Sequence, residues 1–178
     1  MRKLRVEEMN RLSVDEFKRS DKFPYVIVLD NIRSLNNVGS FFRTADAFRA
    51  KKIILCGYTQ QPPHREITRS ALGAELSVEW EKAELTTEAV KKLQADGYRV
   101  LAVEQVEGST ELRKYDFDPE LSYAFVFGNE VEGVSDEVMT LVNGCIEIPQ
   151  FGTKHSFNVS VSAGIVLWEF VRKMITII

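Results

Sequence analysis

Cysteine and histidine are scarce in this sequence, with two of each among 178 residues. Cys56 and Cys145 lie far apart and form no Cys-x-x-Cys pair, which excludes a disulfide scaffold and argues against a thiol-rich metal site. No spacing of histidine, cysteine and aspartate is typical of a metal centre, so we expect no metal. The two cysteines are best explained as buried thiols in a reducing cytoplasm.

Long apolar runs are also missing. The longest uncharged stretch near the end, Ser156 to Trp168, is shorter and more polar than the roughly 20 apolar residues that span a bilayer. The residues from Met1 to Leu12 are rich in charge and lack the apolar core of a signal peptide. No linker rich in proline, glycine or serine divides the chain, so its 178 residues predict one domain. These absences favour a cytoplasmic protein without a membrane segment.

The net charge of −3 hides an uneven distribution along the chain. Residues 1–70 contain 14 Lys and Arg and 8 Asp and Glu, whereas residues 71–178 contain 9 and 18. A basic face on an acidic protein is what a polyanion would bind. The alternative is that the two halves interleave in space and their fields cancel, and charge alone leaves both open.

Five short apolar runs predict strands, because each is rich in β-branched or aromatic residues and ends at a turn residue or a carboxylate. They are Tyr25–Leu29, Lys52–Cys56, Tyr98–Val103, Tyr123–Phe127 and Cys145–Ile148. Near-continuous apolar runs, rather than alternating ones, indicate parallel strands that are covered on both faces.

Helical patterns separate these runs. The expected helices are Val14–Arg19 with a capping box from Ser13 and Glu16, Val38–Phe48, Glu88–Ala95, a short helix capped by Ser135, and Val159–Ile175. The last is apolar on nearly all sides, as in a helix that is buried or lies at a subunit interface. Alternating strands and helices predict an α/β domain with a mainly parallel sheet and helices on both faces. Ligands of such sheets bind beyond the carboxyl ends of the strands.

Three polar segments follow strands, where a site is expected. In the first, Asp30 to Arg43, three asparagines precede or open a helix, whose free backbone N–H groups favour an anion. In the second, Gly128 to Gly133, two glycines flank Glu130, as in a tight loop whose backbone closely approaches a ligand. The third, Ile148 to Ser162, runs from a strand end through a polar loop into the last helix.

Simpler explanations exist for single residues of these segments. Asn37 can be a plain helix cap, and Arg43 can form a surface ion pair with Asp46. Glu130 and Glu132 do not suit an acid–base pair, because residues two apart in an extended loop point away from each other. No G-x-G-x-x-G or Walker sequence is present, which argues against an ordinary nucleotide-binding enzyme.

Together and in this order, the three segments resemble the motifs of the SpoU/TrmH branch of the SPOUT methyltransferases, across about Tyr25 to Val171. Two short segments further resemble the catalytic domains of tRNA ribose methyltransferases that act on a D-loop guanosine, namely Val103-Glu-Gln105 and Ile148-Pro-Gln150. The resemblance implies an α/β fold with a C-terminal trefoil knot, S-adenosylmethionine as cofactor and a homodimer. It implies a methyltransferase domain over residues 25–178, and residues 1–24 would then be a basic helical extension in place of a separate RNA-binding domain.

By position, the resemblance implies cofactor contacts at Val103, Glu104, Gly128, Ile148 and Phe157, the last where many relatives have leucine. It implies a catalytic arginine, Arg43, and a reacting centre formed with Asn37, Glu130, Ser156 and Asn158. Because a guanidinium stays protonated, Arg43 would bind phosphate and stabilise the developing alkoxide rather than act as the base.

RNA contacts are expected from basic residues and histidines, namely Arg11, Arg33, His64, Arg65, Arg69 and His155. For each of these, plain solvated surface is the alternative, and for His155 a role as general base is disfavoured. The expected function is transfer of a methyl group from S-adenosylmethionine to a ribose 2′-OH of RNA, with tRNA favoured over rRNA. The alternative is a non-catalytic RNA-binding module that keeps the knotted fold.

Overall fold

A computed structural model, which describes residues 1–177, contains one sheet of seven parallel strands. The strands are β1 (Tyr25–Asp30), β2 (Lys52–Cys56), β3 (Glu79–Ala83), β4 (Tyr98–Val103), β5 (Thr110–Glu111), β6 (Ser122–Phe127) and β7 (Gly144–Glu147). They lie in the order β3-β2-β1-β6-β4-β7-β5, and every neighbouring pair is parallel. The predicted mainly parallel α/β sheet is therefore confirmed.

Helices connect the strands in the described residues. They are η1 (Val6–Met9), α1 (Val14–Arg19), α2 (Leu35–Ala47), α3 (Arg65–Ala71), α4 (Ala74–Ser77), α5 (Thr86–Ala95), η2 (Leu112–Lys114), α6 (Asp136–Met139) and α7 (Val159–Ile177). The expected helices are present, α1 with the expected bounds and α2, α5 and α7 with shifted ends. Ser135 lies at the start of α6, but its hydroxyl donates to Asp30 Oδ2 at 2.8 Å and does not cap the helix. The short elements η1, α3, α4 and η2 are additions that the sequence patterns did not predict.

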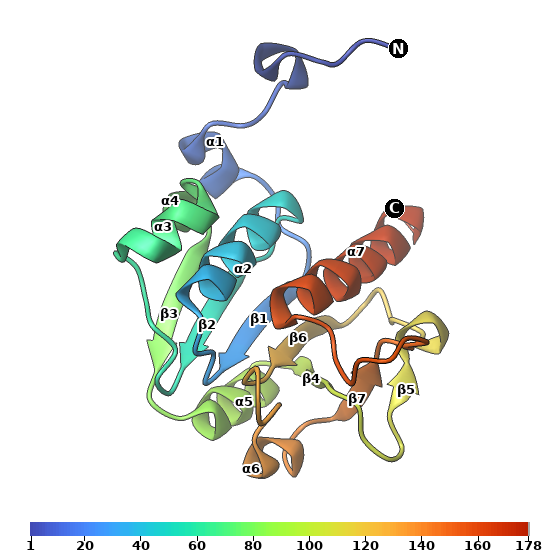
Figure 1. The fold of residues 1–178 in the computed structure, drawn as a ribbon. Helices are drawn as coiled ribbons and strands as arrows, with labels where there is room; N and C mark the ends of the chain where they lie inside the picture. Colours follow the sequence, from blue (N-terminus) through green and yellow to red (C-terminus); the bar gives the residue numbers. More distant parts are fainter. Residues whose placement is uncertain (178) are drawn as a thin grey trace.

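Side chains from the two faces of the sheet form two separate cores. On β1, Tyr25, Ile27 and Leu29 point to the core beneath α2, α3 and α7, whereas Val26 and Val28 point to the core beneath α5 and α6. Figure 1 shows these helices on the sheet, with α2 and α7 side by side. Helices on both faces explain why the internal strands are continuous apolar runs.

The two edge strands were not predicted. β3 has the sequence Glu-Trp-Glu-Lys-Ala and β5 is two residues long, and they form the opposite edges of the sheet. Charged residues and short length are common at sheet edges, because they discourage pairing with another chain. These strands therefore lack the apolar signal that marks the internal ones.

The C-terminal half of the sheet is not assembled in chain order. The chain passes through β4 and β5 and then places β6 between β1 and β4, after which β7 inserts between β4 and β5. This order is compatible with the trefoil knot of the expected fold class, and the threading of the chain through a knot stays a prediction.

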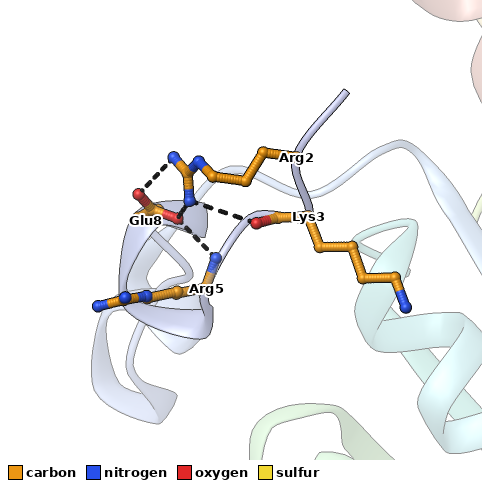
Figure 2. A network of polar contacts seen from close by, with 4 residues as sticks. All are labelled: Arg2, Lys3, Arg5 and Glu8. Atoms are coloured by element: carbon orange, nitrogen blue, oxygen red, sulfur yellow. Dashed lines mark hydrogen bonds and ion pairs between the residues drawn. The ribbon is translucent and has the colours of Figure 1, made fainter.

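The segment before β1 extends away from the sheet (Figure 1) and is held to it by α1. The expected capping box is present, since Ser13 Oγ accepts from Glu16 N and Glu16 Oε2 accepts from Ser13 N at 2.8 Å. Phe17 is the buried anchor of α1. Further out, Arg2 forms a two-pronged ion pair with Glu8, both bonds being 2.9 Å long (Figure 2).

Helix α7 is apolar on more than one side. Ala163, Val166 and Phe170 are buried against the sheet, whereas Val161 and Trp168 are 50% and 53% exposed. That α7 lies at a subunit interface stays a prediction. No helix of residues 1–177 is long and apolar enough to cross a membrane.

Candidate active site

A cavity of about 660 Å³ lies at the carboxyl edge of the sheet. Three loops enclose it, namely those that follow β4, β6 and β7, and the first turn of α7 closes one side. This is the edge at which ligands of parallel sheets bind. The volume is in the usual range for a small-molecule site, about 300–1,000 Å³.

Glu130, at the rim of this cavity, is bonded to the loop between β1 and α2. Its carboxylate accepts the backbone N–H groups of Arg33 and Ser34, each at 3.0 Å, and the side-chain amide of Asn37 at 2.9 Å. The second polar segment is thereby joined to the first, although 93 residues separate Glu130 from Asn37. Two backbone donors and one side-chain donor fix both carboxylate oxygens.

Asn37 also connects this hydrogen-bond network to the third polar segment. Its Oδ1 atom accepts from Asn158 Nδ2 at 3.2 Å, and Asn158 Oδ1 in turn accepts from Ser160 at the start of α7. Asn37 is therefore not the cap of α2. That helix begins at Leu35, and Ser34 is its cap, accepting from Asn37 N at 3.3 Å.

The loop of residues 128–133 folds back on itself so tightly that Gly128 has no room for a side chain. Asn129 and Gly133 exchange two backbone hydrogen bonds of 2.9 Å, and a Cβ on Gly128 would lie 2.1 Å from Gly133 C and from Val134 N. Asn129 Oδ1 accepts from the N–H groups of Val131 and Glu132 within the loop. The tight backbone of this loop therefore leaves no space for a side chain at Gly128, which lines the cavity.

Glu130 is held in its ionised form. Burial opposes ionisation, but the hydrogen bonds from Arg33 N, Asn37 and Ser34 N outweigh it, so the pKa of Glu130 lies below its ordinary value. A carboxylate whose oxygens already accept three donors organises the site and is a poor proton carrier. Burial raises the pKa of Cys145, beside the cavity loops, to about 11, so its thiol is inert at neutral pH.

The low pKa of Glu130 predicts an acid-sensitive contribution to stability. A carboxyl group whose pKa is lower in the folded state than in the unfolded state contributes stability at a pH above its unfolded pKa of about 4.3. This contribution is lost as the pH falls through the folded-state pKa. Glu130→Gln should be less stable by about 1–2 kcal/mol at pH 7, allowing for its exposure. Urea unfolding from pH 7 to pH 3 should show that the difference in unfolding free energy between the wild type and Glu130→Gln becomes smaller below about pH 4.3. Glu132→Gln, two residues away, is the control, and a gap that does not change with pH would contradict the assignment.

Most residues singled out in the sequence gather at this cavity. Its lining includes all five expected cofactor contacts, together with three of the expected catalytic residues: Val103, Glu104, Gly128, Ile148, Phe157, Glu130, Ser156 and Asn158. Asn37 joins them through its hydrogen bonds. Arg43 does not line the cavity, and its side chain is exposed on α2 without a hydrogen bond or ion pair among the described residues, so the alternative pair with Asp46 is not formed.

The expected RNA-contacting residues lie outside the cavity. His64 caps α3 by accepting from Glu66 N, and Arg65 and Arg69 are exposed on that helix. Helix α3 packs closely on α2, since a Cβ on Gly39 would lie 2.0 Å from Ser70 Oγ. Arg33 and His155 are exposed in the loops around the cavity, and Arg11 is exposed in the N-terminal segment between η1 and α1.

The structure adds the polar residues Asn31, Tyr58 and Asn129, which the sequence analysis did not single out, and new contacts of Glu104 and Gln105, which it did. Asn129 Nδ2 donates to Asn31 O and to the phenol oxygen of Tyr58, which ties the loop after β6 to the loops after β1 and β2. Glu104 accepts from Val134 N, and Gln105 donates to His155 O. Asn31 and Asn129 lie within the polar segments, which is a signal that could have found them, whereas Tyr58 follows a strand without any motif.

Similarity to solved structures defines the class of this fold. The structure of an AdoMet-bound rRNA methyltransferase from Sinorhizobium meliloti matches with a TM-score of 0.80 and 29% identity, over 89% of this chain and 60% of that one. In sequence, the chain is 33% identical to a tRNA (guanosine(18)-2'-O)-methyltransferase of Mus musculus, over 84% of this chain and 9% of that protein. It is 28% identical to the tRNA (guanosine(18)-2'-O)-methyltransferase of Thermus thermophilus, over 93% of this chain and 84% of the relative.

The fold is thus similar to that of RNA methyltransferases. The model of the SpoU rRNA Methylase family matches residues 24–168, and the protein belongs to this family. The expected SpoU/TrmH membership is confirmed. The chain spans only a small part of the mouse relative, 9% of its length.

Proposed function

We propose that the protein transfers a methyl group from S-adenosylmethionine to a ribose 2′-OH of RNA, with tRNA as the favoured substrate over rRNA. The observation that carries this proposal is the Glu130–Asn37–Asn158 network, which joins three segments distant in sequence at the rim of one cavity. Family membership and the activities for which the relatives are named support it. As an RNA-modifying enzyme, it would work in the cytoplasm.

The cavity suits S-adenosylmethionine in size and in chemistry. Gly128 and the loop that follows it present backbone N–H and C=O groups, and a side chain at Gly128 would displace this cradle. Five carboxylates line the cavity, which favours a ligand with a sulfonium and an ammonium group: Glu104, Glu130, Glu132, Asp136 and Glu147. When bound, the cofactor supplies a methyl group that is already activated, so the protein's task is alignment.

The chain's own residues account for alignment and for charge. Asn37, Glu130 and Asn158 form a rigid polar rim that can position the ribose, and correct positioning alone can lower a barrier by about 7–11 kcal/mol. The free guanidinium of Arg43 can bind an RNA phosphate and stabilise the alkoxide that forms when the 2′-OH loses its proton. Because Glu130 is ionised and fully bonded, the RNA phosphate itself is the more suitable proton acceptor in this proposal.

A homodimer would complete this site. Arg43 lies on α2, outside the cavity of its own chain, and α2 packs beside α7, whose Val161 and Trp168 are exposed. A second copy docked on this apolar face would bury it and would bring Arg43 of one copy to the cavity of the other. Sedimentation equilibrium tests the dimer, and a monomer at every concentration would remove it from the proposal.

Basic residues on two parts of the surface are proposed to bind RNA. Arg33 lies on the loop before α2, and His64, Arg65 and Arg69 lie at the start of α3 or on it, where Arg69 donates to Asn36 near the start of α2. His155 lies on the loop between β7 and α7. Arg11 lies on the proposed N-terminal extension, residues 1–24, where Arg2 is already neutralised by Glu8. Phosphate contacts of this kind predict RNA affinity that falls steeply as salt rises, and affinity that is independent of salt would contradict them.

A labelling assay tests the proposed function. Purified total tRNA and rRNA are incubated separately with labelled S-adenosylmethionine and the protein, and the digested RNA is examined for 2′-O-methyl nucleosides. We expect label in tRNA, and binding of S-adenosylhomocysteine that raises the melting temperature. RNA binding with neither label nor a shift with S-adenosylhomocysteine would favour a non-catalytic RNA-binding module.

A further inference from the structure

The loop between β7 and α7 has very little to hold it in place. Residues 151–157 are all exposed, with Phe151 94% exposed, and they form no backbone–backbone hydrogen bond with the rest of residues 1–177. Yet this stretch includes Ser156 and Phe157, both of which line the cavity. The position of these two residues therefore depends on few contacts.

One side chain outside the loop holds it by a hydrogen bond. Gln105 Nε2 donates to the backbone oxygen of His155 at 2.8 Å, and no other hydrogen bond within the described residues joins residues 151–157 to the remaining chain. His155 directly precedes Ser156. The bond is therefore made at the point of the loop where it most affects how Ser156 faces the cavity.

Gln105 is itself fixed by the end of β4. Glu104 N donates to Ile146 O on β7, and the Glu104 carboxylate accepts from Gln105 N at 2.9 Å. The other oxygen of this carboxylate accepts from Val134 N at 3.2 Å, in the chain that leaves the 128–133 loop. Glu104 and Gln105 together therefore connect all three loops that enclose the cavity.

We infer that Gln105 is a positioning residue, whose side-chain amide holds the loop of residues 151–157 so that Ser156 and Phe157 face the cavity. The inference rests on the proposed function for its catalytic meaning. The structural part of the inference does not depend on the function, because it concerns only the hydrogen bond from the side-chain N–H of Gln105 to the backbone oxygen of His155. A side chain of similar length without a donor leaves that oxygen unbonded and the loop free to move away.

Two variants separate the donor from the size of the side chain. Gln105→Met keeps the length and removes the donor, whereas Gln105→Lys keeps a donor that can reach the same carbonyl. Gln94→Met is the matched control, because Gln94 Nε2 also donates to a backbone carbonyl, that of Leu141 at 2.7 Å, and Gln94 does not line the cavity.

Two measurements are made on each variant. Trypsin cleavage after Lys154, followed by mass spectrometry, reports the freedom of the loop without any ligand, and calorimetry reports the dissociation constant of S-adenosylhomocysteine. Gln105→Met should raise both the cleavage rate and the dissociation constant by about tenfold, the effect of one lost hydrogen bond. Gln105→Lys should stay within about threefold of the wild type, as should Gln94→Met, with melting temperatures unchanged for the Gln105 variants.

The outcomes distinguish this inference from the proposed function. If cleavage after Lys154 and cofactor affinity are the same in Gln105→Met as in the wild type, or if Gln105→Lys behaves like Gln105→Met, the positioning role is overturned. If the wild type binds no S-adenosylhomocysteine but cleavage still rises in Gln105→Met alone, the loop is held as inferred and the proposed function fails.

Discussion

Replacing Arg43 with alanine is expected to lower the rate of methyl transfer to RNA by about a hundredfold or more, while S-adenosylhomocysteine binds as to the wild type. The reason is that Arg43 has an exposed guanidinium without a partner in the described residues and does not line the cavity of its own chain. It is therefore free to meet an RNA phosphate and a developing alkoxide, and it contributes little to the cofactor site. Single-turnover transfer to tRNA, with calorimetry on the same protein, measures both quantities.

Two further variants sharpen the Arg43 experiment. Arg43→Lys keeps the charge but loses the planar pair of donors, so it should recover only part of the rate. Lys91→Ala removes an exposed cation from α5, on the opposite face of the sheet, and should leave the rate near that of the wild type. A wild-type rate for Arg43→Ala, at saturating RNA, would remove this residue from the reaction.

Gly128→Ala should have the largest effect on the cofactor site. The added methyl group would lie 2.1 Å from Gly133 C and Val134 N, which are backbone atoms that cannot rotate away. The loop must open, so we expect a loss of about 1–3 kcal/mol in the free energy of unfolding. We also expect S-adenosylhomocysteine to bind about a hundredfold more weakly, since this loop forms one wall of the cavity.

Gly144→Ala is the matched control for Gly128→Ala. A Cβ on Gly144 would meet only Leu101 Cδ2 at 3.4 Å, an ordinary contact with a flexible side chain, and Gly144 does not line the cavity. Urea unfolding and calorimetry should show both quantities near wild type. Normal cofactor affinity in a folded Gly128→Ala protein would mean that the 128–133 loop does not touch the cofactor.

The internal strands could be predicted from sequence because their surroundings are uniform. Tyr25–Asp30 is buried on both faces, so every residue is apolar until Asp30, which lies at the carboxyl end. β3, by contrast, contains three charged residues and lies at an edge of the sheet, where none of its residues is buried. The apolar pattern reports burial, and a strand with little burial gives little pattern.

The site could be predicted in part, because parallel strands bring their carboxyl ends to one edge. That rule predicted where the site lies, and the resemblance to the SpoU/TrmH motifs implied that Gly128, Glu130, Ser156 and Asn158 belong to it. The structure places all four at one cavity. The same rule did not show which residue caps α2. Ser34 and Asn37 are both suitable caps, and the structure decides between them because the helix begins at Leu35 and Ser34 Oγ accepts from Asn37 N.

The sequence by itself determined the α/β class, the internal strands, the family and the three segments that make the site. Only the tertiary structure decided which groups in those segments bond to each other. The hydrogen bond between Glu130 and Asn37 joins residues that are 93 positions apart in the sequence. The bond between Asn37 and Asn158 spans 121 positions, and the bond between Gln105 and His155 spans 50 positions. The reason is physical: periodicity and capping act within a few residues along the chain, whereas these hydrogen bonds depend on strand order, which brings distant loops within 3 Å or so of one another.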